Sequence, residues 1–322
     1  MIESPVRWGI LGAGGIAAVF TEDLLRLPGH EVVAVGSRSA DTAAAFASRH
    51  GVPTAHGSYA GLAADERVDV VYVATPHPLH YAPARLCLEA GRAVLVEKPF
   101  TTSAADAERL AGLARERDLF AMEAMWTRFN PLVRKLTGLV RDGAVGEVTA
   151  VYADFCTAAP FDPQSRLWSR DLGGGALLDL GCYVLSFTWP LLGAPDTVRA
   201  VSTPAPTGVD AATGIVLGYG SGALAVLHCG FTGASPHTAT VVGTRGRIEV
   251  AAPFYRPTSM TLIRDGRDPE TVTAAFEGRG YTHQAEEVAR CLRAGLAESP
   301  LMPLEESVAV LRVIEEITAQ TR

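Results

Sequence analysis

The chain has 322 residues, which is long for one domain and enough for two domains that each bury a hydrophobic core. Its 28 basic and 35 acidic residues give a formal net charge of -7, and the basic residues are scattered, which argues against nucleic acid as a partner. We also expect no membrane span and a cytoplasmic protein, because no apolar stretch comes near the roughly 20 residues of a spanning helix and the first residues do not resemble a signal peptide.

The first third of the chain alternates short apolar runs with amphipathic segments, which predicts βαβ units around a parallel sheet. The expected strands are 6–11, 31–36, 68–74, 93–97 and 120–124, and the expected helices are 16–27, 41–50, 81–90 and 103–117. The pattern changes near Met125, so we place one domain at 1–125 and a second at 126–322.

The second domain begins with a helix at 131–142 and a strand at 148–157, and a long loop and a helix ending near Gly193 follow. Further strands are expected at 197–202, 213–217, 223–231, 238–242, 246–250, 260–263 and 270–275, before two helices at 282–297 and 304–320. Consecutive strands joined by short turns favour an antiparallel sheet. The fold class is therefore α/β, with a C-terminal α+β domain that holds a large, mostly antiparallel sheet.

A glycine-rich turn follows the first expected strand. Gly12, Gly14 and Ala17 have the spacing of a dinucleotide-binding turn, and Gly15 and Ile16 lie within it. Gly12 permits the tight turn and Gly14 leaves room for a pyrophosphate, which the helix amides would face. The motif predicts an N-terminal Rossmann domain; the alternative is an ordinary glycine turn between a strand and a helix.

The end of the second strand distinguishes between the two nicotinamide cofactors. NAD enzymes usually carry an acid there for the ribose 2′-hydroxyl, whereas this chain has Ser37 and Arg38. A serine hydroxyl and a planar guanidinium suit a 2′-phosphate, so NADP is favoured over NAD. The alternative is that Arg38 is a solvated surface residue.

Two more strand ends carry candidate cofactor contacts. Thr75, Pro76, His77 and His80 follow the run 68–74 and are expected to form a rigid cofactor-facing loop. Two histidines with no cluster of Cys, Asp or Glu are weak support for zinc, so we predict no metal.

Glu97 and Lys98 end the strand 93–97, where nucleotide-binding folds open their ligand crevice. A cation there can polarise an oxygen or hold a nearby acid in its reactive state, so the chain is predicted to be an enzyme.

Asp179 and Tyr183 are four residues apart and therefore share one face of an otherwise apolar helix. A buried carboxylate needs a partner, and either Tyr183 or Lys98 could supply it. The alternative is a helix that packs the domains together, with Asp179 satisfied by backbone amides.

The glycine turn, the Glu97-Lys98-Pro99 sequence and the glycine-run helix with Asp179 and Tyr183 resemble the Gfo/Idh/MocA family of NAD(P)-dependent oxidoreductases over essentially the whole chain. The segments 123–129, 174–183 and 302–307 resemble its branch of dimeric dihydrodiol dehydrogenase and NADP-dependent D-xylose dehydrogenase. Many family members have His where Tyr183 stands, and that branch has Tyr.

The resemblance implies hydride transfer between the nicotinamide and a carbinol or carbonyl flanked by Lys98 and Tyr183. Tyr183 would accept or donate the proton, Lys98 would lower its pKa, and Asp179 would orient the lysine or a substrate hydroxyl. Which of Lys98 and Tyr183 takes the proton first stays open, because their titrations can be coupled.

Seven further residues could form an aromatic, hydrogen-bonding wall for a small-molecule substrate. They are Trp126, Arg128 and Phe129, with Phe155, Phe161, Arg166 and Trp168. Each one alone also fits a core position, and the resemblance places Trp126 and Arg128 nearest the crevice.

The expected function is an NADP-dependent oxidoreductase acting on an aldose or a trans-dihydrodiol. The alternatives are a ketosugar reductase, an NAD-dependent glycosidase and a non-catalytic NADP-sensing regulator. Intact Lys98, Asp179 and Tyr183 argue against the regulator, and the missing acid near Ser37 argues against the glycosidase. The resemblance also implies a homodimer or homotetramer that packs through the C-terminal sheet.

Overall fold

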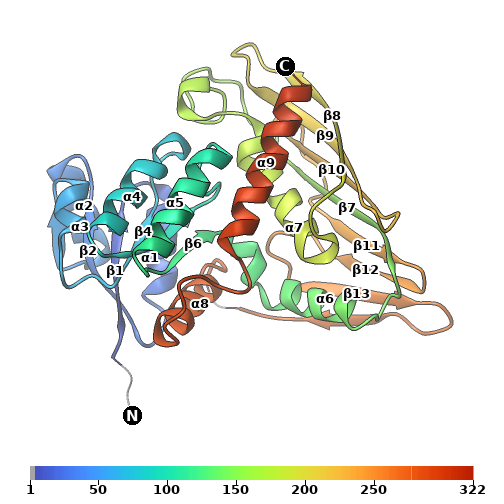
Figure 1. Cartoon of the computed structure of the whole chain (residues 1–322), viewed down its shortest axis with the longest axis horizontal. Coiled ribbons are helices and arrows are strands. Elements are labelled where there is room, and N and C mark those ends of the chain that lie inside the picture. Colours follow the sequence, from blue (N-terminus) through green and yellow to red (C-terminus); the bar gives the residue numbers. More distant parts are fainter. Residues whose placement is uncertain (1–3, 277, 322) are drawn as a thin grey trace. The chain divides into compact units, whose positions relative to one another are not determined.

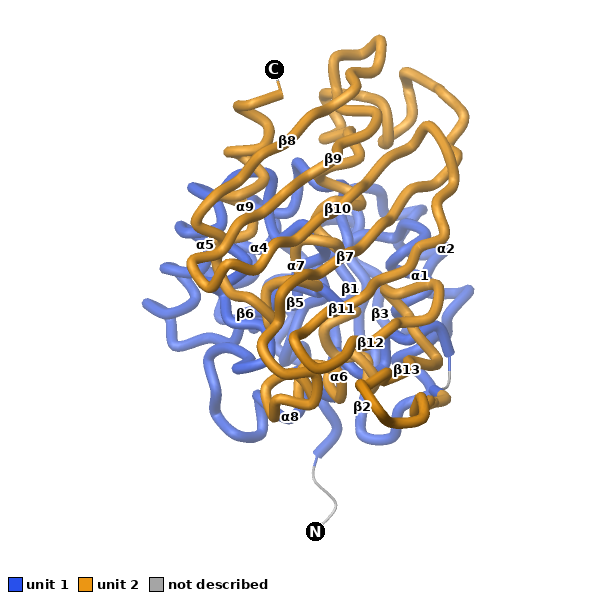
Figure 2. The backbone as a smooth tube through the Cα atoms, turned by 90° about the vertical axis from the view of Figure 1, so that its right-hand side faces the viewer, with its two compact units in different colours: residues 1–126, 276–308 blue, residues 127–275, 309–322 orange. Residues whose placement is uncertain are grey.

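The computed structural model describes residues 4–276 and 278–321, and the chain divides into two compact units. Unit 1 comprises residues 1–126 and 276–308, and unit 2 comprises residues 127–275 and 309–322 (Figure 2). The boundary predicted from the sequence, between residues 125 and 126, put residues 276–308 in the second domain, whereas they belong to unit 1. The separate roles expected of 1–125 and 126–322 stay a prediction.

Unit 1 is built on a six-stranded parallel sheet with the order β3-β2-β1-β4-β5-β6 (Figure 1). This is the strand order of a dinucleotide-binding Rossmann domain, so that part of the predicted fold is confirmed. The strands are β1 (Val6–Leu11), β2 (His30–Gly36), β3 (Thr54–His56), β4 (Val70–Val73), β5 (Ala93–Glu97) and β6 (Ala121–Ala124). The helices between them are α1 (Gly15–Leu24), α2 (Ala40–His50), α3 (Tyr59–Ala63), α4 (Tyr81–Glu89) and α5 (Ala104–Glu116).

The core of this sheet follows from the apolar runs in the sequence. Every residue of β4, β5 and β6 is buried, as expected for parallel strands covered on both faces. Three of the helices begin at serine caps, where Ser39, Ser58 and Ser103 each accept a hydrogen bond from a first-turn amide. Because the strands are buried on both faces, polar side chains are expected mainly where the strands end.

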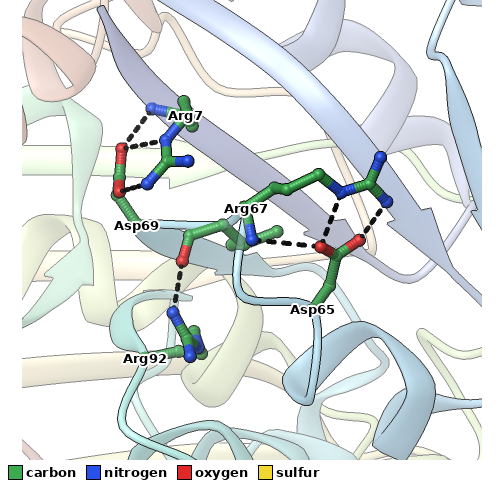
Figure 3. Close-up of polar contacts among 6 residues, drawn as sticks. Arg7, Asp65, Arg67, Asp69 and Arg92 are labelled. Carbon is green, nitrogen blue, oxygen red and sulfur yellow. Dashed lines mark hydrogen bonds and ion pairs between the residues drawn. The ribbon is translucent and has the colours of Figure 1, made fainter. Parts of the chain in front are cut away.

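Ion pairs hold the amino edge of the sheet (Figure 3). The guanidinium of Arg7 lies 2.6 Å from a carboxylate oxygen of Asp69, and that of Arg67 lies 2.7 Å from Asp65. Arg92 donates a hydrogen bond of 2.9 Å to a backbone carbonyl of the same loop. These arginines have partners of their own at the amino edge, opposite the carboxyl ends of the strands.

The segment 276–308 completes unit 1. It contains α8 (Thr282–Arg293), which packs on α1. Asp23, which is buried, accepts the backbone N–H groups of Arg279 and Tyr281 at 2.9 and 3.0 Å. The first turn of α9 (Leu304–Gln320) also belongs to this unit.

Unit 2 contains an eight-stranded sheet with the order β14-β13-β12-β11-β7-β10-β9-β8. All neighbouring strands are antiparallel except β7 and β10, which confirms the predicted large, mostly antiparallel sheet. The strands are β7 (Val148–Cys156), β8 (Thr197–Pro204), β9 (Asp210–Gly218), β10 (Leu224–Gly230), β11 (Ala239–Gly243), β12 (Gly246–Val250), β13 (Ser259–Arg264) and β14 (Glu270–Thr273). The unit also holds α6 (Pro131–Arg141) and α7 (Cys182–Leu192).

The two faces of this sheet differ. One face packs against α7, which contacts β7 and β10. The other face is turned toward the viewer in Figure 2, with α7 behind the strands. It carries apolar side chains that are each more than 40 % exposed: Tyr152, Val201, Val216, Leu224 and Val226.

The helix expected after the glycine run has an unexpected start. Residues Leu177–Gly181 form a π-helical turn, and α7 follows directly. By length and composition the helical run Arg170–Leu192 could cross a bilayer, which corrects the expectation that no stretch comes near that length. Because 72 % of its most apolar stretch of 18 residues is buried inside the protein, its hydropathy is that of a core helix.

Candidate active site

The glycine turn in unit 1 has the space that a dinucleotide needs. Gly12 has a φ of +102°, and a Cβ there would lie 2.6 Å from the carbonyl oxygen of Ala74, so only glycine fits. A Cβ on Gly14 or Gly15 would meet nothing within 4 Å. The packing of the protein itself therefore does not require glycine at these two positions. The open space beside them lies at the N-terminus of α1. Ile16, the next residue, is half-buried. These residues fit a pyrophosphate.

The end of β2 offers polar groups beside this turn. Ser37 is half-buried and Arg38 is exposed. Across residues 4–276 and 278–321, Arg38 takes part in no ion pair, so its guanidinium is available to an added anion. The Ser37 hydroxyl lies 3.4 Å from the amide of Ser39, which caps α2. Both side chains fit the 2′-phosphate of NADP.

The loop after β4 turns its second histidine inward. His80 is fully buried, and its Nδ1 and Nε2 lie 2.7 and 2.8 Å from the carbonyl oxygens of Pro99 and Thr75. Burial lowers the pKa of His80 to about 4, so the neutral ring donates to one carbonyl at a time. His77 is half-buried and Pro76 is exposed. The role of all four loop residues as cofactor contacts stays a prediction.

Lys98 follows β5 directly, and its backbone is bound by the preceding side chain. The Lys98 amide donates a hydrogen bond of 3.1 Å to the carboxylate of Glu97, which is buried. The hydroxyl of Tyr72 on β4 also donates to Glu97. The Lys98 side chain is half-buried, at the carboxyl end of the sheet.

The second candidate group lies in unit 2. Asp179 is in the π-helical turn, and Tyr183 is in the first turn of α7. Both are buried, with 7 % of each residue exposed. Asp179 has a partner that the sequence did not indicate: the guanidinium of Arg166 lies 3.3 Å from its carboxylate. π-Helical turns are rare and are frequent at functional sites.

Aromatic rings surround Tyr183 within unit 2. Its ring lies edge-on to Phe155 at 5.2 Å between centroids and at 5.9 Å from Tyr255. Phe155 and Tyr255 are stacked at 4.3 Å. The ring of Tyr183 is thus packed among aromatic rings of unit 2.

Two matches to protein families cover most of the chain. Residues 6–124 match the family described as an oxidoreductase family with an NAD-binding Rossmann fold, and residues 133–249 match the GFO/IDH/MocA C-terminal domain. The chain belongs to the Gfo/Idh/MocA oxidoreductase family. The family predicted from the sequence is thereby confirmed.

Similar curated members of the Gfo/Idh/MocA family have one activity in their names. The trans-1,2-dihydrobenzene-1,2-diol dehydrogenase of Sus scrofa is 38 % identical over an alignment 322 residues long, gaps included, that covers 97 % of this chain and 96 % of that protein. The Homo sapiens enzyme of the same name is 37 % identical over 321 residues, with the same two coverages.

Two solved structures show the same fold over 99 % of this chain and 98 % of theirs. An aldose-aldose oxidoreductase from Caulobacter crescentus, complexed with glycerol, has a TM-score of 0.90 at 26 % identity. A 3-ketoreductase from Actinomadura kijaniata, in complex with NADP and TDP-benzene, has a TM-score of 0.86 at 28 % identity.

The residues predicted to form a substrate wall are mostly buried. In unit 1, Trp126 stacks on Tyr281 at 4.5 Å between ring centroids. In unit 2, Arg128 donates a hydrogen bond of 3.3 Å to the carbonyl of Ser186, and Phe129 is 2 % exposed. The hydrogen bond of Arg128 and the burial of Phe129 give these two residues structural roles. A substrate contact by Trp126, Arg128 or Phe129 stays a prediction.

Phe161 and Trp168 form an aromatic pair in the loop before the π-helical turn. Their ring centroids are 5.3 Å apart, and the Trp168 indole donates a hydrogen bond of 2.9 Å to the carbonyl of Pro160. Trp168 is 3 % exposed, whereas Phe161 is 49 % exposed. Phe161 is thus the more accessible of the two for a ligand.

Two carboxylates with clear structural roles were not among the predicted site residues. Asp210 on β9 accepts the amide of Leu177 at 2.7 Å and so starts the π-helical turn. Glu123 on β6 accepts the amide of Phe100 at 3.1 Å. Each carboxylate binds a backbone amide that lies far away in the sequence, and the periodicity of apolar residues does not reveal such a contact. Among residues 4–276 and 278–321, no group of three or more His, Cys, Asp or Glu side chains could hold a metal ion.

Proposed function

We propose that this protein is an NADP-dependent dehydrogenase that oxidises a carbinol of an aldose or of a trans-dihydrodiol. One observation carries this proposal: a buried carboxylate and phenol, Asp179 and Tyr183, lie together in a chain that matches dihydrodiol dehydrogenases over nearly its whole length. An aldose oxidoreductase and an NADP-bound ketoreductase with the same fold also support it.

The cofactor assignment rests on the residues at the ends of β1 and β2. Gly14 and Gly15 leave space at the N-terminus of α1, and Arg38 offers a guanidinium with no ion pair among the described residues. Bound NADP⁺ would supply the hydride acceptor for the oxidation. The chain supplies the phosphate contacts and the groups that move the proton.

Proton transfer is assigned to Lys98 and Tyr183. A phenol ordinarily titrates near pH 10, so Tyr183 needs nearby positive charge to act as a base at neutral pH. Asp179, held by Arg166, is suited to orient a second substrate hydroxyl. Phe155 and Tyr255 present ring faces and edges beside Tyr183, which suits the apolar face of a sugar or a cyclic diol.

The proposal is tested by nicotinamide absorbance on purified protein with NADP⁺ or NAD⁺ and with D-xylose, D-glucose or a trans-dihydrodiol. We expect reduction of NADP⁺ that Tyr183→Phe abolishes. Tyr59→Phe is the matched control, because it removes the same hydroxyl from α3 in unit 1. No turnover by the wild type with any of these substrates, despite NADP binding, would contradict the proposal.

A ketosugar reductase is the second candidate. The structural neighbour that is a 3-ketoreductase, with 28 % identity, favours it. The same residues would act in the opposite direction, with Tyr183 donating the proton. Oxidation of NADPH by a ketosugar, without reduction of NADP⁺ by any aldose, would favour this candidate.

We also propose that the protein is a cytoplasmic homodimer or homotetramer that packs through the exposed face of the unit 2 sheet. Val216, Val226 and Tyr152 lie opposite one another on β9, β10 and β7, and all three are exposed. Contiguous exposed apolar surface commonly marks an interface. The five cysteines are buried and form no disulfide with one another, as is usual in a reducing compartment.

A further inference from the structure

Three buried side chains bind the backbone of the short segment that carries Lys98. The Lys98 amide donates to Glu97 at 3.1 Å, and the Phe100 amide donates to Glu123 at 3.1 Å. Between them, the Pro99 carbonyl oxygen lies 2.7 Å from the ring of His80. Three consecutive residues thus have a backbone group held by an ionisable side chain, and all these groups lie in unit 1.

Glu123 is the member of this set that reaches the segment from another strand. It lies on β6, opposite Val96 of the neighbouring strand β5, and is 5 % exposed. A carboxylate placed there without a hydrogen-bond donor would be strongly destabilising. Its contact with the Phe100 amide gives it a donor and anchors the far end of the segment, two residues after Lys98.

The charges that face Glu123 come from two elements. Glu97 lies on β5, and Glu306 and Ser307 lie in the first turn of α9. Burial raises the pKa of Glu123 to about 7, and the negative charges of Glu306 and Glu97 act in the same direction. The Ser307 hydroxyl and the Phe100 amide favour the ionised form.

From this geometry we infer that Glu123 is a positioning residue for Lys98: its ionised carboxylate holds the Phe100 amide and so fixes the place of the lysine, and its protonation loosens that hold. The effect of Glu123 on catalysis, unlike its effect on Lys98, rests on the proposed function. A hydrogen bond to an ionised acceptor is roughly twice as strong as one to a neutral acceptor, so protonation weakens the anchor without removing it.

A lysine-labelling experiment tests the inference without any substrate. The chain contains only two lysines, Lys98 and Lys135, and the second lies exposed on α6 in unit 2 as an internal standard. The protein is treated briefly with an amine-acetylating reagent at a series of pH values, and mass spectrometry gives the ratio of modification at Lys98 to that at Lys135. We expect a step in this ratio centred near the pKa of Glu123, at about pH 7.

Glu123→Gln keeps an acceptor oxygen but cannot titrate, so the step is expected to disappear in this variant. The control Glu116→Gln removes a carboxylate from an exposed position at the end of α5 and is expected to keep the step. Glu123→Leu, checked for folding by circular dichroism, removes the acceptor and should change the ratio at every pH. No step in the wild type, or a step that persists unchanged in Glu123→Gln, would overturn the inference.

A second readout uses turnover with NADP⁺ and whichever substrate the enzyme accepts. Because protonated Glu123 holds the Phe100 amide less tightly, log kcat of the wild type should fall more steeply below about pH 7 than log kcat of Glu123→Gln, in which only the base titrates. KM for NADP⁺ should change less than about twofold, because the carboxylate acts on Lys98. An identical slope in both proteins would overturn the catalytic part. If no substrate turns over, the proposed function fails and the labelling result still decides the role of Glu123.

Discussion

The two sheets of this protein place their polar groups in different ways. In unit 1 the central strands are buried on both faces, so polar side chains gather where the strands end, as Glu97 and Glu123 do. In unit 2 the sheet has one packed face and one exposed face, and Asp179 and Tyr183 lie on the helical segment at the packed face. The first sheet thus gathers its ionisable groups at the strand ends, whereas the second packs aromatic residues on one face and exposes apolar side chains on the other.

The largest expected effect tests whether the strand end in unit 1 is catalytic. Lys98→Met should lower kcat by about 10²–10⁴, because a positioned acid–base group typically contributes that much. Steady-state rates with NADP⁺ are compared with those of Lys135→Met, which removes the chain's other lysine. Equal losses in the two variants would contradict a special role for Lys98.

The pH dependence of stability tests how unit 1 holds its buried charges. An ordinary glutamate titrates near 4.5, whereas the pKa of Glu123 is raised to about 7 by burial. Between these pH values the native state binds the extra proton, so stability falls as pH rises, by roughly 3 kcal/mol in all. Urea unfolding at a series of pH values should therefore show that the wild type loses this much more stability between pH 4.5 and 7 than Glu123→Gln does.

His80 gives the opposite pH dependence, which sharpens the same measurement. Its pKa is lowered from 6.5 to about 4 by burial, so the unfolded state binds the proton first and stability rises with pH across that range. The two contributions oppose each other below about pH 6.5. Glu123→Gln should therefore uncover a rise in stability with pH, and a flat profile in this variant would contradict the assignment of His80.

The difference between the sheets also explains what the sequence could predict. Local signals identified unit 1: the run before Glu97 is a buried strand, and Gly12 has the positive φ that its turn demands. The short β3 and α3 were missed, because three and five residues carry no usable periodicity.

In unit 2 the sequence predicted the strands but not the contacts that shape the site. The spacing of Asp179 and Tyr183 indicated a helix, whereas the π-helical turn depends on Asp210, which lies far along the chain. Arg166 was not predicted as the partner of Asp179, because a loop conformation brings them together. The return of 276–308 to unit 1 likewise depends on Asp23, which binds amides more than 250 positions away.

The exposed face of the unit 2 sheet provides the next test. Val226→Arg places a charge in the centre of the apolar row, where two symmetric copies would bring like charges together, and should raise the dimer dissociation constant by roughly 100-fold. Sedimentation velocity measures the effect. Leu25→Arg, at an exposed leucine of unit 1, is the control. A wild type that is monomeric at high concentration, or a variant with unchanged mass, would contradict an interface here.

The smallest expected effect tests the cofactor preference at the edge of unit 1. Arg38→Ala should raise KM for NADP⁺ by about tenfold, because one charge-assisted contact to a phosphate is lost, and leave KM for NAD⁺ nearly unchanged. Arg49→Ala, at the other end of α2, removes an exposed arginine away from the glycine turn and controls for net charge. If KM rises equally for NADP⁺ and NAD⁺, Arg38 contacts the part common to both cofactors. The choice between the cofactors then depends on other residues, and Ser37 is the first to substitute.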